Sequence, residues 1–171
     1  MLNNLIINII RFIFLVLLQV LILDQIYLNG YINPFLYIMF LMMLPFDIPH
    51  WFLLIISFLL GFSVDIFSNT LGLHTSACVL IGFIRPYILS SIEPRDGYEA
   101  GMKPELQYMG LNWYFHYAGI LTLIHHLWLF YLEVFRFSDF FMTLWRVILS
   151  SLFTLILIII SQYLIYKRRR T

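Results

Sequence analysis

The chain has 171 residues, of which 62% are hydrophobic and only 11% are charged. A soluble globular domain is about 45–50% apolar and roughly 25% charged, so charge is too sparse here to cover a surface that faces water. The composition therefore excludes a soluble domain, a disordered chain and a coiled coil, and it predicts an integral membrane protein. Cys78 is the only cysteine, which excludes a disulfide within the chain.

The charged residues divide the chain into long uncharged runs, each of which is typical of a membrane-spanning helix. Such a helix needs about 20 mainly apolar residues at a rise of about 1.5 Å each. The sequence predicts an all-α, six-helix transmembrane bundle that forms one domain over residues 1–171. We expect the helices at about residues 5–23, 34–44, 50–67, 71–89, 112–131 and 141–166.

Proline and polar residues mark the ends of several predicted helices. Pro34 suits the first turn of a helix, where a missing N–H costs little. Pro45 and Pro49 are four residues apart and exclude a regular helix between them. The polar run 68–70 is expected to form a turn that caps the helix after it. The largest hydrophilic segment, residues 90–107, is expected to be a solvated loop of mixed charge.

The distribution of Lys and Arg predicts the orientation, because short cytoplasmic loops carry an excess of these residues. Six spans place both termini on one side, together with the basic tail 167–170 and the 90–107 loop. Arg136 is the basic residue expected on the opposite side. We therefore expect a multi-pass protein with both termini in the cytoplasm, and we expect the tail to bind anionic lipid.

Asp65 and Gly61 form the sharpest local feature. They lie one turn apart on one helix face, near the end of an apolar run. An acid in such a place is a functional-site hypothesis, and a glycine lets another helix approach closely. The alternative is that Asp65 sits at the interface and caps the following turn. Arg85 is expected near the opposite membrane surface and is not expected to pair with Asp65.

No pattern in the sequence predicts catalysis or a resident metal. A P-loop, a dinucleotide fingerprint, a nucleophile elbow and zinc-ligand spacing are all absent. His125 and His126 are adjacent, so they point about 100° apart on a helix and are poorly placed for one metal. We expect them to form hydrogen bonds inside the bundle, and we expect Gln19 to bond another helix. No cofactor, metal or catalytic residue is predicted.

Four features between the first and fourth predicted helices resemble the MreD family, the rod shape-determining membrane proteins of the bacterial cell elongation machinery. The longest is Gly61 to His74, which contains the family's Gly-x-x-x-Asp, Ser and Leu-Gly pattern. The others are Leu17-Leu18-Gln19, Asn33-Pro34 and the break from Leu44 to Pro49. The second half of the chain agrees only in its pattern of a polar loop, two long helices and a basic end. Arg85-Pro86 departs from the plain apolar fourth helix of some relatives.

The resemblance implies a non-enzymatic protein of the bacterial inner membrane that maintains cell shape. It implies the partner MreC, and through it MreB and the peptidoglycan glycosyltransferase–transpeptidase pair. Beyond these partners it leads us to expect membrane lipids and no nucleic acid. The candidate partner or packing surface consists of Gln19, Gly61, Asp65, Gly72 and His74.

The same resemblance supplies a rival function. The family's fold is similar to the substrate-binding subunit of energy-coupling-factor transporters, which also has six helices. A membrane component that binds a small solute for transport is therefore the alternative. An intramembrane lipid-processing enzyme is a weaker alternative, because no catalytic constellation is visible.

Overall fold

The computed structural model describes residues 2–25, 32–99, 102–134 and 140–170, with side chains within 5–165 of these ranges. Five long helices dominate them: α1 (Leu2–Leu21), α3 (His50–Ser68), α4 (Leu73–Ser91), α6 (Leu111–Val134) and α7 (Phe140–Arg170). The shorter elements are η1 (Leu23–Gln25), η2 (Leu36–Ile38), α2 (Met39–Met42) and α5 (Leu106–Met109). All the elements assigned within these ranges are helical.

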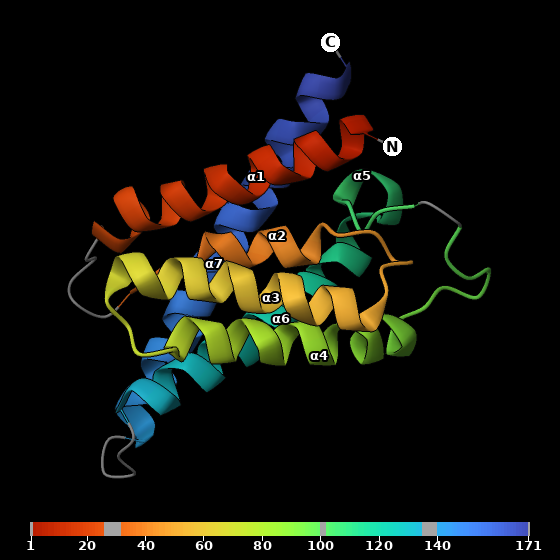
Figure 1. Ribbon diagram of the computed structural model, residues 1–171. Coiled ribbons are helices and arrows are strands. Elements are labelled where there is room, and N and C mark those ends of the chain that lie inside the picture. The colour runs from red at the N-terminus through yellow and green to blue at the C-terminus, as the bar shows by residue number, and fades with distance from the viewer. Residues whose placement is uncertain (1, 26–31, 100–101, 135–139, 171) are drawn as a thin grey trace.

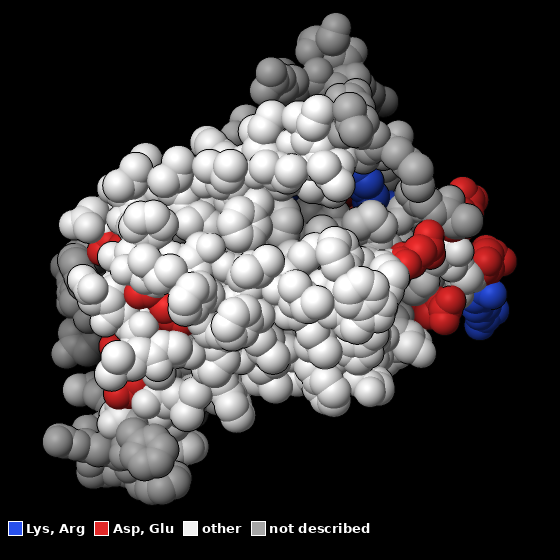
Figure 2. Space-filling view, viewed as in Figure 1, with Lys and Arg blue, Asp and Glu red and all other residues white. Residues whose placement is uncertain are grey.

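The five long helices are also the five that are long and apolar enough to cross a membrane. Their positions agree with five of the six predicted helices to within a few residues. Figure 2 shows a broad face without charge between two ends that carry charged side chains. This arrangement is consistent with a multi-pass membrane protein whose apolar surface faces lipid.

The sixth predicted span, residues 34–44, differs from the prediction. Its helical part runs only from Leu36 to Met42, as η2 followed by α2. Even the full predicted range would rise only about 16 Å, roughly half of the hydrocarbon thickness. Residues 35–44 are all buried, so this helix is enclosed by the other helices and does not face lipid.

We call residues 32–49 the inner segment. Its start contacts the end of α1 through Gln19, and its end contacts Arg85 near the end of α4. Figure 1 shows it passing through the bundle from one end to the other, beside α3. Because Pro45 and Pro49 prevent α2 from continuing into α3, the chain turns there and begins α3 at His50.

The helices α3 and α4 form a tightly packed antiparallel hairpin. A Cβ atom added to Gly61 would lie 2.5 Å from the Cα of Thr75 and 2.6 Å from the carbonyl oxygen of His74. A Cβ atom added to Gly82 would lie 2.2 Å from the Oγ of Ser57. The predicted close approach at Gly61 is therefore a contact between two helices of this chain. Small residues permit such contacts in membrane bundles.

The turn between α3 and α4 differs in one detail from the prediction. Asn69 ends α3 with a positive φ of 54°, and Gly72 precedes α4 with a φ of 87°. The 68–70 turn does not supply the side-chain cap of α4. The capping oxygens come instead from Asp65 on α3, which lies directly opposite the first residues of α4.

Substitution at Gly61 tests the close approach. Gly61→Ala places a methyl group against the backbone of α4, which cannot move aside as a flexible side chain can. Overpacking of this kind costs about 1–3 kcal/mol, so the thermal unfolding temperature in detergent should fall.

Gly119→Ala is the matched control, because this helical glycine has only Leu155 near its added Cβ, at 3.9 Å. The control should leave the unfolding temperature unchanged or raise it, since alanine favours a helix over glycine by about 1 kcal/mol. Equal unfolding temperatures for the two variants would contradict the close contact.

Candidate functional site

The candidate site is the set of buried polar side chains that surround the inner segment. Gln19 of α1 lies at its beginning and is fully buried. Its amide nitrogen donates to the carbonyl of Pro34 at 2.9 Å, and its amide oxygen accepts from the N–H of Leu36 at 2.9 Å. The same nitrogen also donates to Asp24 at 2.8 Å. Gln19 therefore forms the predicted contact with another element, and its partners are backbone groups at the start of η2.

Helix α7 supplies the next partners of the inner segment. The N–H of Asn33 donates to the Oγ of Ser150, and the N–H of Phe35 donates to Thr154, both at 3.1 Å. Thr154 also bonds Nε2 of His126 at 3.1 Å. These contacts satisfy the N–H groups of Asn33 and Phe35, which precede the first turn of η2 and have no partner within that helix.

Tyr37 joins two histidines at the centre of the bundle. Its hydroxyl lies 2.8 Å from Nδ1 of His74 on α4 and 2.9 Å from Nε2 of His125 on α6. Phe35 packs against both histidine rings, at centroid distances of 5.2 and 5.8 Å. Hydrogen bonding by the histidines inside the bundle is thus as expected, and it ties three separate elements together.

Arg85 plays the corresponding part at the other end of the inner segment. It is 1% exposed and donates from Nη2 to the carbonyls of Leu44 and Pro45. Its Nε donates to the hydroxyl of Tyr117 at 2.8 Å, and Tyr117 donates to the carbonyl of Met42 at 3.1 Å. These carbonyls lie at and just after the end of α2, inside the bundle, where a cation is favourable.

The loop after α4 closes over this end. Tyr98 stacks on Phe46 at a centroid distance of 4.1 Å and donates to the carbonyl of Leu89 at 2.8 Å. Partial burial raises the pKa of Tyr98 to about 12. Trp113 donates to the carbonyl of Ile92 at 2.9 Å.

Asp65 is committed to the α3–α4 turn. Its carboxylate accepts from the N–H of His74 at 3.1 Å and of Thr75 at 2.8 Å. The hydroxyls of Thr70 and Thr75 donate to it as well. The interpretation of Asp65 as a cap is therefore the one that the contacts favour. As predicted, Asp65 and Arg85 do not pair: Asp65 of α3 bonds the first residues of α4, whereas Arg85 lies toward the other end of α4 and bonds the inner segment.

Four of the five predicted site residues form two pairs according to what they contact, and the fifth, Gly72, belongs to neither pair. Gln19 and His74 contact the inner segment, whereas Gly61 and Asp65 fasten α3 to α4. Gly72 provides a positive φ and has open space around its Cα. These positions serve packing within the chain; whether a partner also contacts them stays a prediction.

Sequence reasoning missed four residues that the structure places at this site. They are Tyr37, Tyr117, Ser150 and Thr154, which lie in aromatic or apolar runs of the sequence. A signal was present, since a proline-broken helix inside a membrane leaves carbonyls that need donors. The sequence predicts Arg85 near the membrane surface, whereas the structure buries its side chain against the end of the inner segment.

A polar cavity of about 450 Å³ opens at the end of the bundle where α1 and α3 end. Its lining includes Asp24, Asn33, His74 and Glu133. Glu133 pairs with Arg146 of α7 at 3.1 Å. Arg146 is therefore a basic residue at this end that the sequence analysis did not place there. Arg136, the basic residue predicted for this end, lies outside the described residues. Within the described residues no cluster of three or more His, Cys, Asp or Glu could hold a metal.

Removal of one hydroxyl tests the contacts at Arg85. Tyr117→Phe removes the hydroxyl that accepts from Nε of Arg85 and donates to the carbonyl of Met42. The Nε and the carbonyl then stay inside the bundle without this partner. A buried polar group left without a partner costs about 1–3 kcal/mol, so the unfolding temperature should fall.

Tyr108→Phe is the control, because Tyr108 is 56% exposed and its hydroxyl has no such role. It should unfold like the unsubstituted protein. If Tyr117→Phe also unfolds at the unchanged temperature, the Arg85 contacts contribute nothing to stability.

Comparison with known proteins gives no match to a protein-family model, to a curated protein or to a solved structure.

Proposed function

We propose that this chain is a membrane scaffold of the MreD family, which maintains cell shape and turns over no substrate. It would bind MreC, and through it support MreB and the peptidoglycan synthases. The family assignment rests on the motif from Gly61 to His74 and on the shorter motifs in the first half of the chain.

One observation supports this proposal most. Several residues of the long motif have a structural role in one helical hairpin: Gly61 permits the close approach, Asp65 caps the turn and Gly72 takes the positive φ. His74 then connects the hairpin to Tyr37 of the inner segment. A motif that serves packing and not chemistry is what a scaffold needs.

The proposal includes the finer topology. The inner segment would be a sixth crossing, with the overall arrangement of an energy-coupling-factor substrate-binding subunit. Helix α1 begins and α7 ends at the same end of the bundle, as six crossings require (Figure 1). The Lys and Arg bias would place this end in the cytoplasm and the bundle in the bacterial inner membrane.

The scaffold proposal predicts a salt-resistant complex and a loss of cell shape on depletion. Cells depleted of the protein should become round or swollen. MreC should co-purify with it in detergent and should stay bound in high salt, because salt screens exposed charges but not packing within the membrane.

If high salt dissociates MreC from the protein, the contact between them lies in the loops and not within the membrane. Normal cell width after depletion, together with no recovery of MreC, would contradict the scaffold.

The polar cavity favours the rival function. A space of about 450 Å³ with acidic, amide and imidazole lining is within the range of small-molecule sites. A small-solute-binding component of a transporter would carry a solute there. Mass spectrometry of an extract from the purified protein distinguishes the two, because a stoichiometric bound solute with normal cell shape on depletion supports transport and opposes the scaffold.

A further inference from the structure

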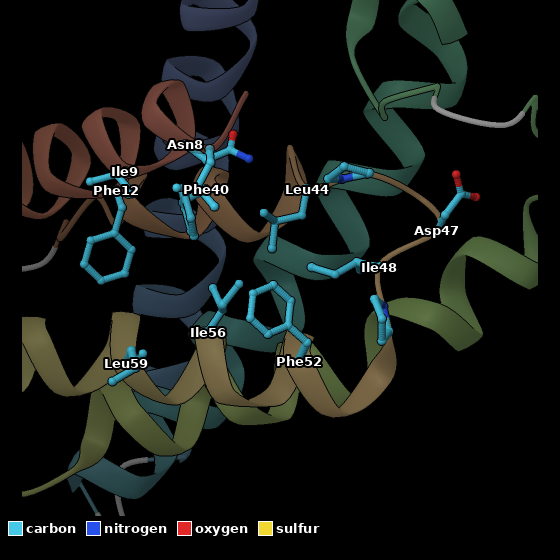
Figure 3. Close-up of a pocket in the computed structure, with 13 residues that line it drawn as sticks. Asn8, Ile9, Phe12, Phe40, Leu44, Asp47, Ile48, Phe52, Ile56 and Leu59 are labelled. Atoms are coloured by element: carbon cyan, nitrogen blue, oxygen red, sulfur yellow. The ribbon is translucent and has the colours of Figure 1, made fainter. Parts of the chain in front are cut away.

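An apolar groove of about 530 Å³ lies between the first half of α1 and the first half of α3. The inner segment forms its floor. Figure 3 shows the side chains of all three elements converging on it. Its apolar lining includes Ile9, Phe12, Phe40, Phe52, Ile56 and Leu59.

The groove exists because α1 and α3 meet at one end of the bundle and separate toward the other. At the closed end Ser68 donates to Asp24 at 2.7 Å, which ties the end of α3 to η1, the turn directly after α1. Toward the N-terminus of α1 the two helices diverge (Figure 1). Phe52 and Leu59 line the groove and are still 43% and 49% exposed, so it opens sideways at the surface of the bundle.

The lining of the groove is apolar along its whole length except for two polar residues. Asp47 lies at one end, in the turn before α3, while Phe12 and Leu59 lie at the other (Figure 3). Asn8 adds a second polar group to the wall formed by α1. From Phe52 to Leu59, and equally from Leu5 to Phe12, the groove follows seven residues of helix, or about 10 Å.

We propose that this groove binds one acyl chain of a membrane glycerophospholipid from the leaflet on the side of the termini. The headgroup lies beside Asp47, and the chain enters the groove toward Phe12 and Leu59. The depth of about 10 Å fits within one leaflet, whose hydrocarbon layer is about 15 Å thick. A sideways apolar space within the bilayer is filled by hydrocarbon, because open space would forfeit the dispersion contacts of its lining.

The dimensions favour an acyl chain over a partner helix. A spanning helix has a diameter of about 10–12 Å and needs about 20 residues to cross the bilayer. The groove follows only about two turns of α1 and ends where α1 and α3 converge, so most of such a helix would lie outside it. This inference requires only that the chain spans a membrane, and it does not depend on the scaffold proposal.

Substitutions that narrow the groove test the inference. The protein and its variants are reconstituted in equal parts of phosphatidylethanolamine and phosphatidylglycerol, and retained lipid is counted by native mass spectrometry. The unsubstituted protein should retain one phospholipid per chain. Ile56→Trp should reduce the retained lipid at least about tenfold, a change of about 1.4 kcal/mol.

Two further variants complete the test. Leu59→Trp should have the same effect and carries the test if Ile56→Trp fails to fold, because Leu59 is already half exposed. Ile55→Trp is the control, since Ile55 is 49% exposed and does not line the groove. Equal lipid retention in all four proteins, no lipid in the unsubstituted protein, or a crosslink from position 56 to another polypeptide's helix would overturn the inference.

Discussion

Irregular backbone inside a membrane must find its hydrogen-bond partners within the protein, and the core of this fold is arranged around that constraint. The helix of the inner segment extends only from Leu36 to Met42, so backbone groups before and after it have no helical partner. Gln19, Ser150 and Thr154 bond groups before this helix and at its first residue. Arg85 and Tyr117 bond carbonyls after it and at its last residue. Because these partners come from α1, α4, α6 and α7, one short segment determines how four long helices are placed.

The same contacts explain why such polar side chains are tolerated in an apolar bundle. A buried amide, hydroxyl or guanidinium costs several kcal/mol unless it is hydrogen-bonded. The side chains around the inner segment avoid this cost because they bond its backbone; they are Gln19, Arg85, Tyr117, Ser150 and Thr154. Tyr37 extends this arrangement by joining the inner segment to His74 and His125. The α3–α4 hairpin follows a different principle, since Gly61 and Gly82 allow two backbones to approach and Asp65 closes the turn.

The sequence predicted the five long helices well because uninterrupted apolar runs leave few alternatives in a membrane. It also located Gly61 and Asp65 correctly on one helix face, and the structure shows what each contacts. The sequence predicts a short helix at 34–44 with prolines at both ends, and the structure shortens it to 36–42. Which helices enclose it could not be predicted, because they come from distant parts of the chain. Tyr117 and Thr154 were missed for a related reason: their partners are 75 and 119 residues away in the chain, and single-sequence patterns carry no such pairing.

Cysteine labelling in right-side-out membrane vesicles tests the proposed topology around this segment most directly, because the proposed six crossings would place the two ends of the inner segment on opposite faces. Gln25 precedes the segment and Asp47 lies near its end, and both side chains are exposed. The native Cys78 is fully buried, so the unsubstituted protein gives the background level of labelling. With a membrane-impermeant maleimide, only one of Gln25→Cys and Asp47→Cys should react before the vesicles are opened, and both should react afterwards. Equal labelling of the two sites in sealed vesicles would contradict a crossing by the inner segment.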